Sequence, residues 1–217
     1  MINAVIFDLD GTLIDTEEFT IRSKMVEGKK LGYNVTREIA LNTCGLSSKE
    51  SNKYMCSLFG EDFPNEYIRS KRFEYIKEDV EKNGLKLKKG VKEIISFCKE
   101  NNIKIYIATA STKKYLDIYK KASPIFDEFD DIITGEMVKY GKPNPEIFLK
   151  VCEEYNYLPC NAIVVEDSNN GIKAALDGNF ISVFIKDLQD VKDEYKPFVT
   201  CLDSLLDLKD YIKKINN

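Results

Sequence analysis

The 217 residues are 43% hydrophobic and 31% charged, the balance of a globular protein that buries a core, not of a disordered or membrane chain. Lysines and arginines number 32 against 36 acidic residues, and this net charge of −4, without a long basic stripe, argues against nucleic acid as a partner. The sequence has no histidine, so acid–base or metal chemistry must come from carboxylates, lysines, tyrosines or cysteines.

The sequence carries no sign of a membrane segment. No apolar run is long enough to span a bilayer, and the first predicted strand begins almost at Met1, which leaves no room for a signal peptide. The six cysteines include no C-x-x-C pair and are typical of small buried hydrophobic side chains in a reducing compartment. We therefore expect a cytoplasmic protein with no membrane association, present as a monomer or weak dimer.

Short apolar runs alternate with helical patterns along most of the chain. The runs that predict buried strands cover residues 4–7, 103–108, 162–165 and 181–185. Between them apolar residues recur with helical spacing, as at Val91, Ile94 and Cys98. This alternation predicts an α/β fold with a doubly wound, Rossmann-like parallel sheet that has helices on both faces.

Residues 16–87 interrupt this alternation. They contain no convincing strand, but they show helical patterns with their own boundary signals, such as Gly60 as a helix stop and Pro64 as a first-turn residue. We predict an all-helical domain over residues 16–87, inserted into an α/β core of residues 1–15 and 88–217. The hinges between the two are expected at residues 14–16 and about 82–90.

Two aspartates follow the first apolar run, in the segment FDLDGTL. Ligands bind at the carboxyl ends of strands in a doubly wound sheet, which is where Asp8 and Asp10 are expected. Two carboxylates held close together repel each other unless a cation lies between them or one is protonated. The alternative is that Asp8 and Asp10 are only turn residues before Gly11, since D-G is a common signal for a hairpin turn.

Other predicted strands also end in polar residues. The second ends in Thr109-Ala110-Ser111-Thr112, whose hydroxyl groups could cap a helix or bind a phosphate. Lys142 follows in the loop GKPNP, where the flanking glycine and proline restrict its position. A later strand ends in Glu166-Asp167, before Ser168 as a candidate helix N-cap.

The order and spacing of these groups closely resemble those of the haloacid dehalogenase superfamily. DLDGT matches its first motif, the Thr109 hydroxyl its second, Lys142 its third and the Glu166-Asp167 pair its fourth. The insert resembles the helical cap of the first subfamily, and the strings TAS, GKPNPEIF and VEDSNNGI resemble the branch with β-phosphoglucomutase and sugar-phosphate phosphatases. The resemblance implies a phosphatase, a phosphoric monoester hydrolase acting on a small phosphorylated metabolite.

The resemblance also implies roles for the core residues. Asp8 would attack phosphorus and form an aspartyl phosphate, while Asp10 would protonate the departing alkoxide and then accept a proton from water. Thr109 and Lys142 would hold phosphoryl oxygens, and Ala110 and Ser111 belong to the same predicted substrate-binding segment. Asp10 argues against dehalogenation, because true dehalogenases of the superfamily lack an aspartate at this position.

A magnesium site is expected between the same strand ends. Mg²⁺ would lie between Asp8, the backbone carbonyl of Asp10 and Asp167, with Glu166 in or near its coordination shell. Oxygen ligands without histidine suit Mg²⁺ better than Zn²⁺.

Hydrolysis is favoured over two alternatives. The β-phosphoglucomutases of the family carry a cap histidine that aligns with Thr20 and a cap arginine that aligns at or near Ser48, and both are missing here. A phosphosugar mutase therefore remains the second hypothesis. A receiver-like signalling module, which also holds a phosphoryl group on an aspartate, is the third, although Asp10 and the helical insert argue against it.

The turn from Cys44 to Ser48 resembles the loop that the family's caps lower onto the leaving group. Gly45, Ser47 and Ser48 are therefore predicted to contact the substrate. The turn is polar without dense positive charge, which favours a small, sugar-like leaving group over a polyanion. The alternative is that it only joins two helices.

Overall fold

The structure of the chain is a computed structural model that describes residues 1–44, 46 and 48–216. The described residues form a six-stranded sheet in the order β3-β2-β1-β4-β5-β6, with every neighbouring pair parallel. The strands are β1 (Ala4–Phe7), β2 (Lys104–Thr109), β3 (Asp131–Thr134), β4 (Ala162–Glu166), β5 (Ile181–Ile185) and β6 (Thr200–Leu202). The predicted doubly wound α/β fold is confirmed. Since β1 lies at the middle of the sheet, its carboxyl end is where the strand order reverses and ligands bind in such folds.

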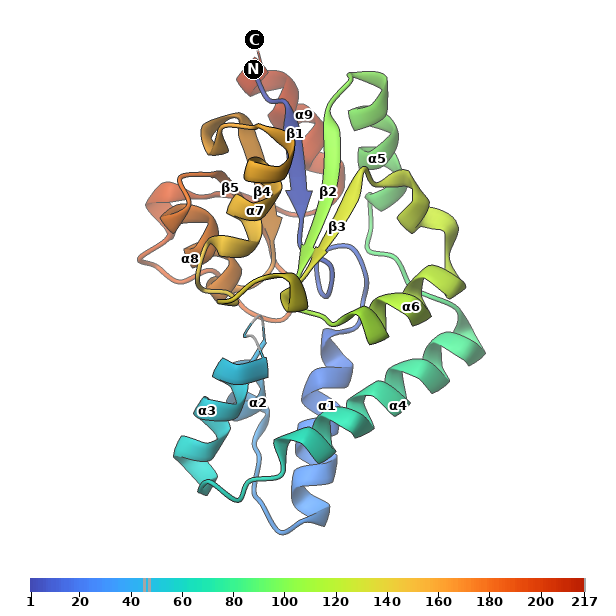
Figure 1. Cartoon of the computed structure of the whole chain (residues 1–217), viewed down its shortest axis with the longest axis vertical. Helices are drawn as coiled ribbons and strands as arrows, with labels where there is room; N and C mark the ends of the chain where they lie inside the picture. The colour runs from blue at the N-terminus through green and yellow to red at the C-terminus, as the bar shows by residue number, and fades with distance from the viewer. Residues whose placement is uncertain (45, 47, 217) are drawn as a thin grey trace.

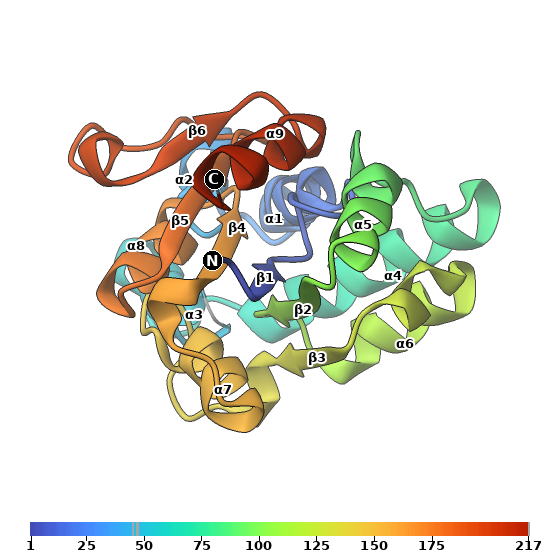
Figure 2. The ribbon, with the colours of Figure 1, turned by 90° about the horizontal axis from the view of Figure 1, so that it is seen from above.

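Helices cover both faces of the sheet and also extend beyond the carboxyl ends of its strands (Figures 1 and 2). They are α1 (Glu17–Lys30), α2 (Arg37–Leu41), α3 (Ser48–Phe59), α4 (Asn65–Asn83), α5 (Val91–Glu100), α6 (Lys113–Ala122), α7 (Glu146–Tyr155), α8 (Asn169–Asp177) and α9 (Leu205–Asn216). Short 3₁₀ helices span Pro124–Glu128, Gly135–Met137, Pro159–Asn161 and Lys196–Phe198.

The side chains of β1 alternate between two hydrophobic clusters. Val5 and Phe7 pack in the cluster that includes residues of α5, α6 and α9. Ala4 and Ile6 pack in the cluster on the opposite face, which includes residues of α7 and α8. A strand buried on both faces is therefore apolar at every position, and each large side chain contributes about 1.5–3 kcal/mol by leaving water.

The predicted strands agree with the structure, except at the edges of the sheet. The runs 4–7 and 181–185 are β1 and β5. The run 103–108 begins and ends one residue before β2, and the run 162–165 ends one residue before β4. The edge strands β3 and β6 were not predicted. Each is three or four residues long with few apolar positions, because an edge strand has one neighbour and is less enclosed.

Helices α1 to α4 gather on the side of the sheet opposite the chain termini (Figure 1). They enclose a small apolar cluster of their own, which includes Ile21, Met55 and Ile68. The last turns of α4 instead bury Ile76 and Val80 in the main cluster of the sheet. The division into a core of residues 1–15 and 88–217 and a cap of residues 16–87 stays a prediction, which this separate cluster supports.

The two segments that connect the sheet to these helices run side by side. Ile14 and Leu87 form an antiparallel bridge. The Asp15 amide donates to the Lys86 carbonyl at 3.0 Å, and the Lys88 amide donates to the Leu13 carbonyl at 2.9 Å. The predicted hinge segments are therefore hydrogen-bonded to each other.

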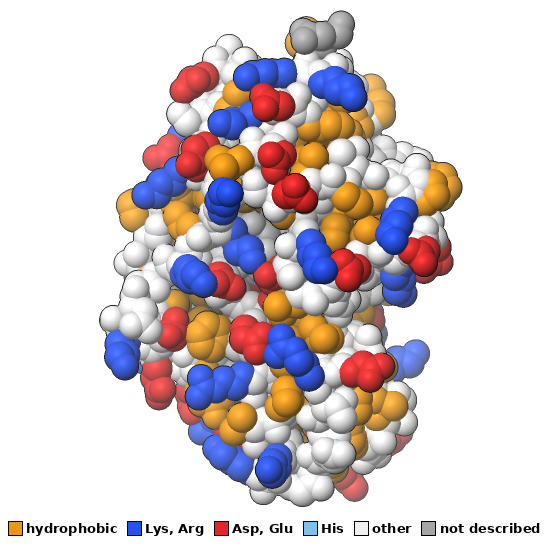
Figure 3. Space-filling model, turned by 180° about the vertical axis from the view of Figure 1, so that it is seen from behind, with side chains coloured by type: hydrophobic (Ala, Val, Ile, Leu, Met, Phe, Trp, Pro, Cys, Tyr) orange, Lys and Arg blue, Asp and Glu red, His pale blue; other side chains and the backbone are white. Residues whose placement is uncertain are grey.

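Charges of both signs are interspersed on the face shown in Figure 3, where lysines and arginines lie beside aspartates and glutamates. Over the described part of the chain, many charged side chains form ion pairs with residues nearby in the sequence, such as Lys173 with Asp177 at 2.7 Å. Among the described helices, none has both the length and the apolar composition needed to cross a bilayer.

Gly90 allows a close approach between the second connecting segment and α9. Its φ is +93°, and a Cβ there would lie 2.6 Å from the backbone nitrogen of Leu206. Gly60 is a matched control, because its φ is +94° but a Cβ would meet no atom within 4 Å.

We predict that Gly60→Ala lowers the unfolding free energy by about 1–2 kcal/mol, the cost of left-handed backbone for alanine. Gly90→Ala should lower it further, since the backbone must also move away from α9. Urea unfolding followed by circular dichroism measures both, and equal losses would contradict the steric account.

Candidate active site

The segment after β1 turns sharply and brings its aspartates to the end of the sheet. The Asp8 amide donates to the Val165 carbonyl at 2.9 Å and so extends the pairing with β4. Gly11 follows with φ +94°, and a Cβ there would lie 2.3 Å from Oδ2 of Asp167. The hairpin alternative is wrong, because β1 pairs in parallel on both sides and the chain continues into α1.

Lys142 lies at the centre of the site and is only 1% exposed. Its ammonium donates to Oδ1 of Asp8, to Oε1 of Glu166 at 2.6 Å and to the Ala108 carbonyl at 3.0 Å. Burial alone lowers the pKa of Lys142, but the Asp8 and Glu166 carboxylates outweigh it and raise this pKa above its ordinary value. The side chain is thus a fixed buried cation that joins the ends of three strands.

Hydrogen bonds from the segment that follows β4 fix the carboxylate of Glu166. Its Oε2 accepts hydrogen bonds from the Ser168 hydroxyl at 2.9 Å and from the backbone amides of Ser168 and Asp167 at 3.1 and 3.2 Å. The Ser168 hydroxyl also accepts from the Gly171 amide at 3.0 Å, which confirms Ser168 as the N-cap of α8. A Cβ at Gly171 would lie 1.9 Å from the Glu166 carboxyl group, so only glycine fits there.

Three of the predicted metal ligands come together. Asp8, Glu166 and Asp167 each offer a carboxylate oxygen, and these atoms lie within 4.8 Å of one another. Burial raises the pKa of Asp8 and of Asp167 well above their ordinary values, and the neighbouring carboxylates raise both further, although Lys142 lowers that of Asp8. A cation among these oxygens would offset that repulsion, and an all-oxygen donor set suits Mg²⁺. The residues present therefore fit the predicted ion.

The Asp10 carboxylate has different partners. Its Oδ1 accepts from the Thr16 hydroxyl at 2.5 Å and the Tyr119 hydroxyl at 3.2 Å, and it lies 3.5 Å from Nη2 of Arg72. Its Oδ2 accepts from the Ser111 hydroxyl at 2.5 Å. The sequence analysis predicted that Asp10 contacts the metal through its backbone carbonyl. Its side chain is hydrogen-bonded to the three hydroxyl groups and is therefore not needed for that contact. The sequence analysis did not predict Thr16, Tyr119 or Arg72 as partners of Asp10. Tyr119 and Arg72 lie on α6 and α4, far from Asp10 in the chain, so their contact depends on the tertiary structure.

The segment after β2 lines the cavity beside Asp10. The Thr109 hydroxyl accepts from the Ser111 amide at 2.9 Å, and among the described residues no acceptor is found for its own proton. Ser111 does not cap α6: its hydroxyl binds Asp10, and the N-cap position is Thr112. Thr109, Ala110 and Ser111 therefore all border the space next to the aspartates, and their contact with substrate stays a prediction.

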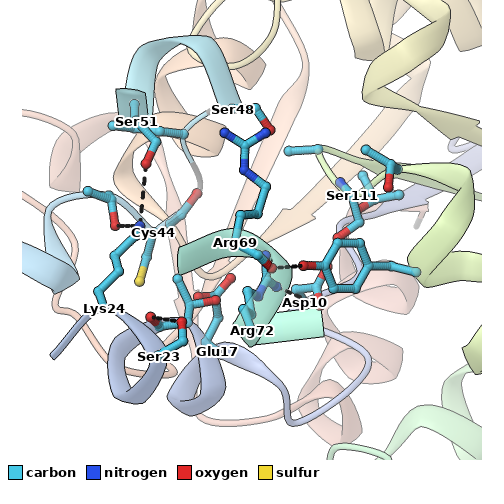
Figure 4. A pocket seen from close by; sticks show the side chains of 18 of the residues that line it. Asp10, Glu17, Ser23, Lys24, Cys44, Ser48, Ser51, Arg69, Arg72 and Ser111 are labelled. Atoms are coloured by element: carbon cyan, nitrogen blue, oxygen red, sulfur yellow. Dashed lines mark hydrogen bonds and ion pairs between the residues drawn. The ribbon is translucent and has the colours of Figure 1, made fainter. Parts of the chain in front are cut away.

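A cavity of about 100 Å³ separates the strand ends from the helices (Figure 4). Its sheet side includes Asp8, Asp10, Thr109 and Asp167, and its helical side includes Glu17, Thr20, Lys24, Ser48, Arg69 and Arg72. Of the predicted loop contacts, Ser48 lines the cavity, whereas Gly45 and Ser47 lie outside the described residues. The charged residues of α1 and α4 were missed. The spacing of Glu17, Thr20 and Lys24 was the available signal, since i, i+3 and i+7 share a helix face.

Residues 5–185 match the model of the haloacid dehalogenase-like hydrolase family. The chain belongs to this family. It is 31% identical over 172 residues to the phosphorylated carbohydrates phosphatase of Thermotoga maritima, which is 79% of each chain. It is 26% identical over 183 residues to hexitol phosphatase B of Escherichia coli, covering 84% of this chain and 82% of that one.

A solved structure of β-phosphoglucomutase from Clostridium difficile resembles the whole fold. The TM-score is 0.82 at 27% identity, over 99% of this chain and 96% of the other. The predicted family and the predicted class, a phosphoric monoester hydrolase, are confirmed.

Thr12 offers a test of how the metal ligands are positioned. It is 1% exposed, and its hydroxyl donates to Oδ1 of Asp167 at 3.0 Å. We predict that Thr12→Val, which keeps the shape and removes the hydrogen bond, weakens Mg²⁺ binding roughly tenfold or more. Thr12→Ser should retain most of the affinity. Isothermal titration calorimetry with MgCl₂ measures both, and equal affinities for the valine and serine variants would contradict a positioning role.

Proposed function

We propose that the protein is a Mg²⁺-dependent phosphatase that hydrolyses a small, sugar-like phosphate monoester through an aspartyl phosphate on Asp8. The observation that carries this proposal is the division between two aspartates that line one cavity. Asp8 lies among Lys142, Glu166 and Asp167, whereas Asp10 lies among hydroxyl groups and an arginine. Different environments give two nearby carboxyl groups different roles, here nucleophile and acid–base group.

The first half of the reaction transfers the phosphoryl group to the protein. A carboxylate oxygen of Asp8 bonds to phosphorus, and the bond between phosphorus and the ester oxygen breaks. Asp10 donates its proton to the departing oxygen, which leaves as an alcohol. The short hydrogen bonds from Thr16 and Ser111 fix the orientation of Asp10 for this transfer.

The second half releases phosphate. Asp10, now deprotonated, accepts a proton from water as the water oxygen bonds to phosphorus, and the bond to Asp8 breaks. Inorganic phosphate leaves, Asp8 is again a carboxylate and Asp10 is again protonated. One water is therefore consumed per ester, with no other reactant.

The remaining residues hold the phosphoryl group and the nucleophile. Mg²⁺, when bound, neutralises phosphoryl charge so that an anionic nucleophile can approach. Asp8, Asp167 and the Asp10 carbonyl would hold the ion, with Glu166 beside it. The Thr109 hydroxyl is available to donate to a phosphoryl oxygen. The three N–H groups of Lys142 already bind protein oxygens, so its main role is to orient Asp8 and reduce repulsion of the substrate dianion.

The residue at position 20 favours hydrolysis over phosphoryl transfer between sugars. A mutase must keep its aspartyl phosphate from water, and the histidine of the family's mutases is replaced here by Thr20, which lines the cavity. The relatives named as carbohydrate and hexitol phosphatases support a small polyhydroxylated substrate.

The first experiment measures phosphate release from sugar phosphates, nucleotides and p-nitrophenyl phosphate, with Mg²⁺ or with a chelator. We expect metal-dependent release, strongest with the sugar phosphates, and none from Asp8→Asn, which lacks the nucleophile. Release that persists in Asp8→Asn would overturn the mechanism. A folded protein that releases no phosphate but transfers it between sugar phosphates would favour the mutase.

A second prediction separates the two aspartates from each other. Asp10→Asn should lower kcat for a sugar phosphate by about 10²-fold or more, since acid–base catalysis typically contributes that much. Its Mg²⁺ affinity should stay close to that of the wild type, because the Asp10 side chain is turned to Thr16, Ser111 and Arg72. Asp167→Asn should lose both activity and Mg²⁺ binding. Calorimetry that finds the same loss of Mg²⁺ affinity in both variants would contradict this division.

A further inference from the structure

The two oxygens of the Asp10 carboxylate have unequal surroundings. Oδ1 accepts from the hydroxyl groups of Thr16 at 2.5 Å and Tyr119 at 3.2 Å, and Nη2 of Arg72 lies 3.5 Å from it. Among the described residues, Oδ2 has one partner, the Ser111 hydroxyl at 2.5 Å. Three groups from separate parts of the chain therefore hold one oxygen, and a single hydroxyl contacts the other.

The charge of Arg72 determines which of these oxygens can carry a proton. A guanidinium has donors and no acceptor, so it attracts an ionised Oδ1 and cannot accept a hydrogen bond from a protonated one. The Ser111 hydroxyl can accept a hydrogen bond as well as donate one, so Oδ2 keeps its partner in both protonation states. Asp10 lies between Ser111 and Arg72, and all three residues line the cavity (Figure 4). The proton that Asp10 exchanges therefore belongs on Oδ2.

Tyr119 offers its hydroxyl from a rigid position. Its side chain is 0% exposed and belongs to the main hydrophobic cluster of the sheet. Its ring stacks on that of Phe126, with 6.4 Å between the centroids and 15° between the ring planes. A side chain whose torsion angles are fixed by packing holds its polar group within a narrow range of positions. The hydroxyl is therefore suited to fixing the orientation of a carboxylate.

Arg72 is fixed by the contact between α4 and α6. Its guanidinium lies over the Tyr115 ring, 4.9 Å from the centroid. The Phe73 ring meets the same tyrosine ring edge-on, with 5.3 Å between the centroids. The Tyr115 hydroxyl also donates to the Arg69 carbonyl at 3.3 Å. The two helices that supply partners to Oδ1 are therefore joined to each other.

We propose that Tyr119 and Arg72 are positioning residues that hold Oδ1 of Asp10, so that Oδ2 is the oxygen that transfers protons. This inference rests on the proposed phosphatase function and assigns both of its proton transfers to one atom. In the first half, the electron pair of the broken bond stays on the ester oxygen, which takes the proton of Oδ2. In the second half, Oδ2 takes a proton from the attacking water, and the carboxyl group ends as it began.

The alternative is a purely structural role, because a buried tyrosine hydroxyl needs a hydrogen-bond partner in any case. Two phosphate esters separate these roles. Phenolate is a basic leaving group and needs a proton from Asp10 as it departs, whereas 2,4-dinitrophenolate is weakly basic and departs without one. A loss of proton transfer therefore slows only the phenyl ester, and a loss of packing slows both esters.

The experiment measures kcat/KM for phenyl phosphate and 2,4-dinitrophenyl phosphate in the presence of Mg²⁺. This ratio covers the steps up to departure of the phenol, so the later reaction with water does not enter it. We expect Tyr119→Phe to lower kcat/KM about tenfold for phenyl phosphate, as for loss of a hydrogen bond to a charged group, and to leave the dinitrophenyl ester unchanged. A sugar phosphate should lose at least as much as phenyl phosphate, because an alkoxide is a more basic leaving group.

Tyr155→Phe is the matched control. It removes a tyrosine–aspartate hydrogen bond of 2.8 Å, to Asp131, and neither residue lines the cavity. Neither kcat/KM value should change. Arg72→Met should show the same selective loss as Tyr119→Phe, and Arg72→Lys should recover most of it, because lysine restores a cation that can donate to Oδ1.

Equal losses for the two esters in Tyr119→Phe and Arg72→Met would show a structural role and overturn the inference, while the phosphatase function stands. Unchanged values for both esters in these variants would overturn it as well. If the wild type hydrolyses neither these esters nor the sugar phosphates, the phosphatase function fails, and the inference fails with it.

Discussion

The buried ammonium of Lys142 is the interaction on which the rest of the site depends. It joins the Asp8 carboxylate after β1, the Glu166 carboxylate at the end of β4 and a carbonyl of β2. Removing one partner of such a buried pair typically costs about 3–5 kcal/mol, because the other charge remains without compensation. The three strand ends must therefore keep their places for the charges to be tolerated. The parallel sheet is what fixes those places, with β1 paired to β2 on one side and β4 on the other.

The carboxylates of Asp8 and Asp10 are only two residues apart in the sequence but have different surroundings in the structure. Asp8 faces the oxygen cluster that fits a divalent cation, and Asp10 faces Thr16, Ser111 and Tyr119. The separation depends on the turn at Gly11, where no side chain fits beside Asp167. A local backbone requirement thus places the Asp8 carboxylate beside those of Glu166 and Asp167 and leaves the Asp10 carboxylate among hydroxyl groups.

Helices α1 to α4 close the cavity and contact the loops of the sheet. The Asn170 side chain donates to the Cys44 carbonyl at 3.3 Å, and the Gln189 side chain donates to the Leu41 carbonyl. Arg72 crosses in the same way, from α4 to Asp10. The helices therefore supply part of the environment of the Asp10 carboxylate as well as one wall of the cavity. Arg69 and Arg72 are neighbours on one surface of α4, and both line the cavity.

The central strands, the family and the residues that follow those strands could be predicted from the amino-acid sequence. A strand buried on both faces is recognisable from its composition, and strand ends in a parallel sheet converge whatever the intervening chain does. Asp8, Asp10, Thr109, Lys142, Glu166 and Asp167 could be named for that reason. The edge strands, the partners of Asp10 and the charge of the cavity wall could not be predicted, because they depend on how the elements pack in the folded chain. Tyr119, Arg72, Lys24 and Arg69 lie on amphipathic helices, where a polar side chain can face water or a cavity, and helix packing alone selects between the two.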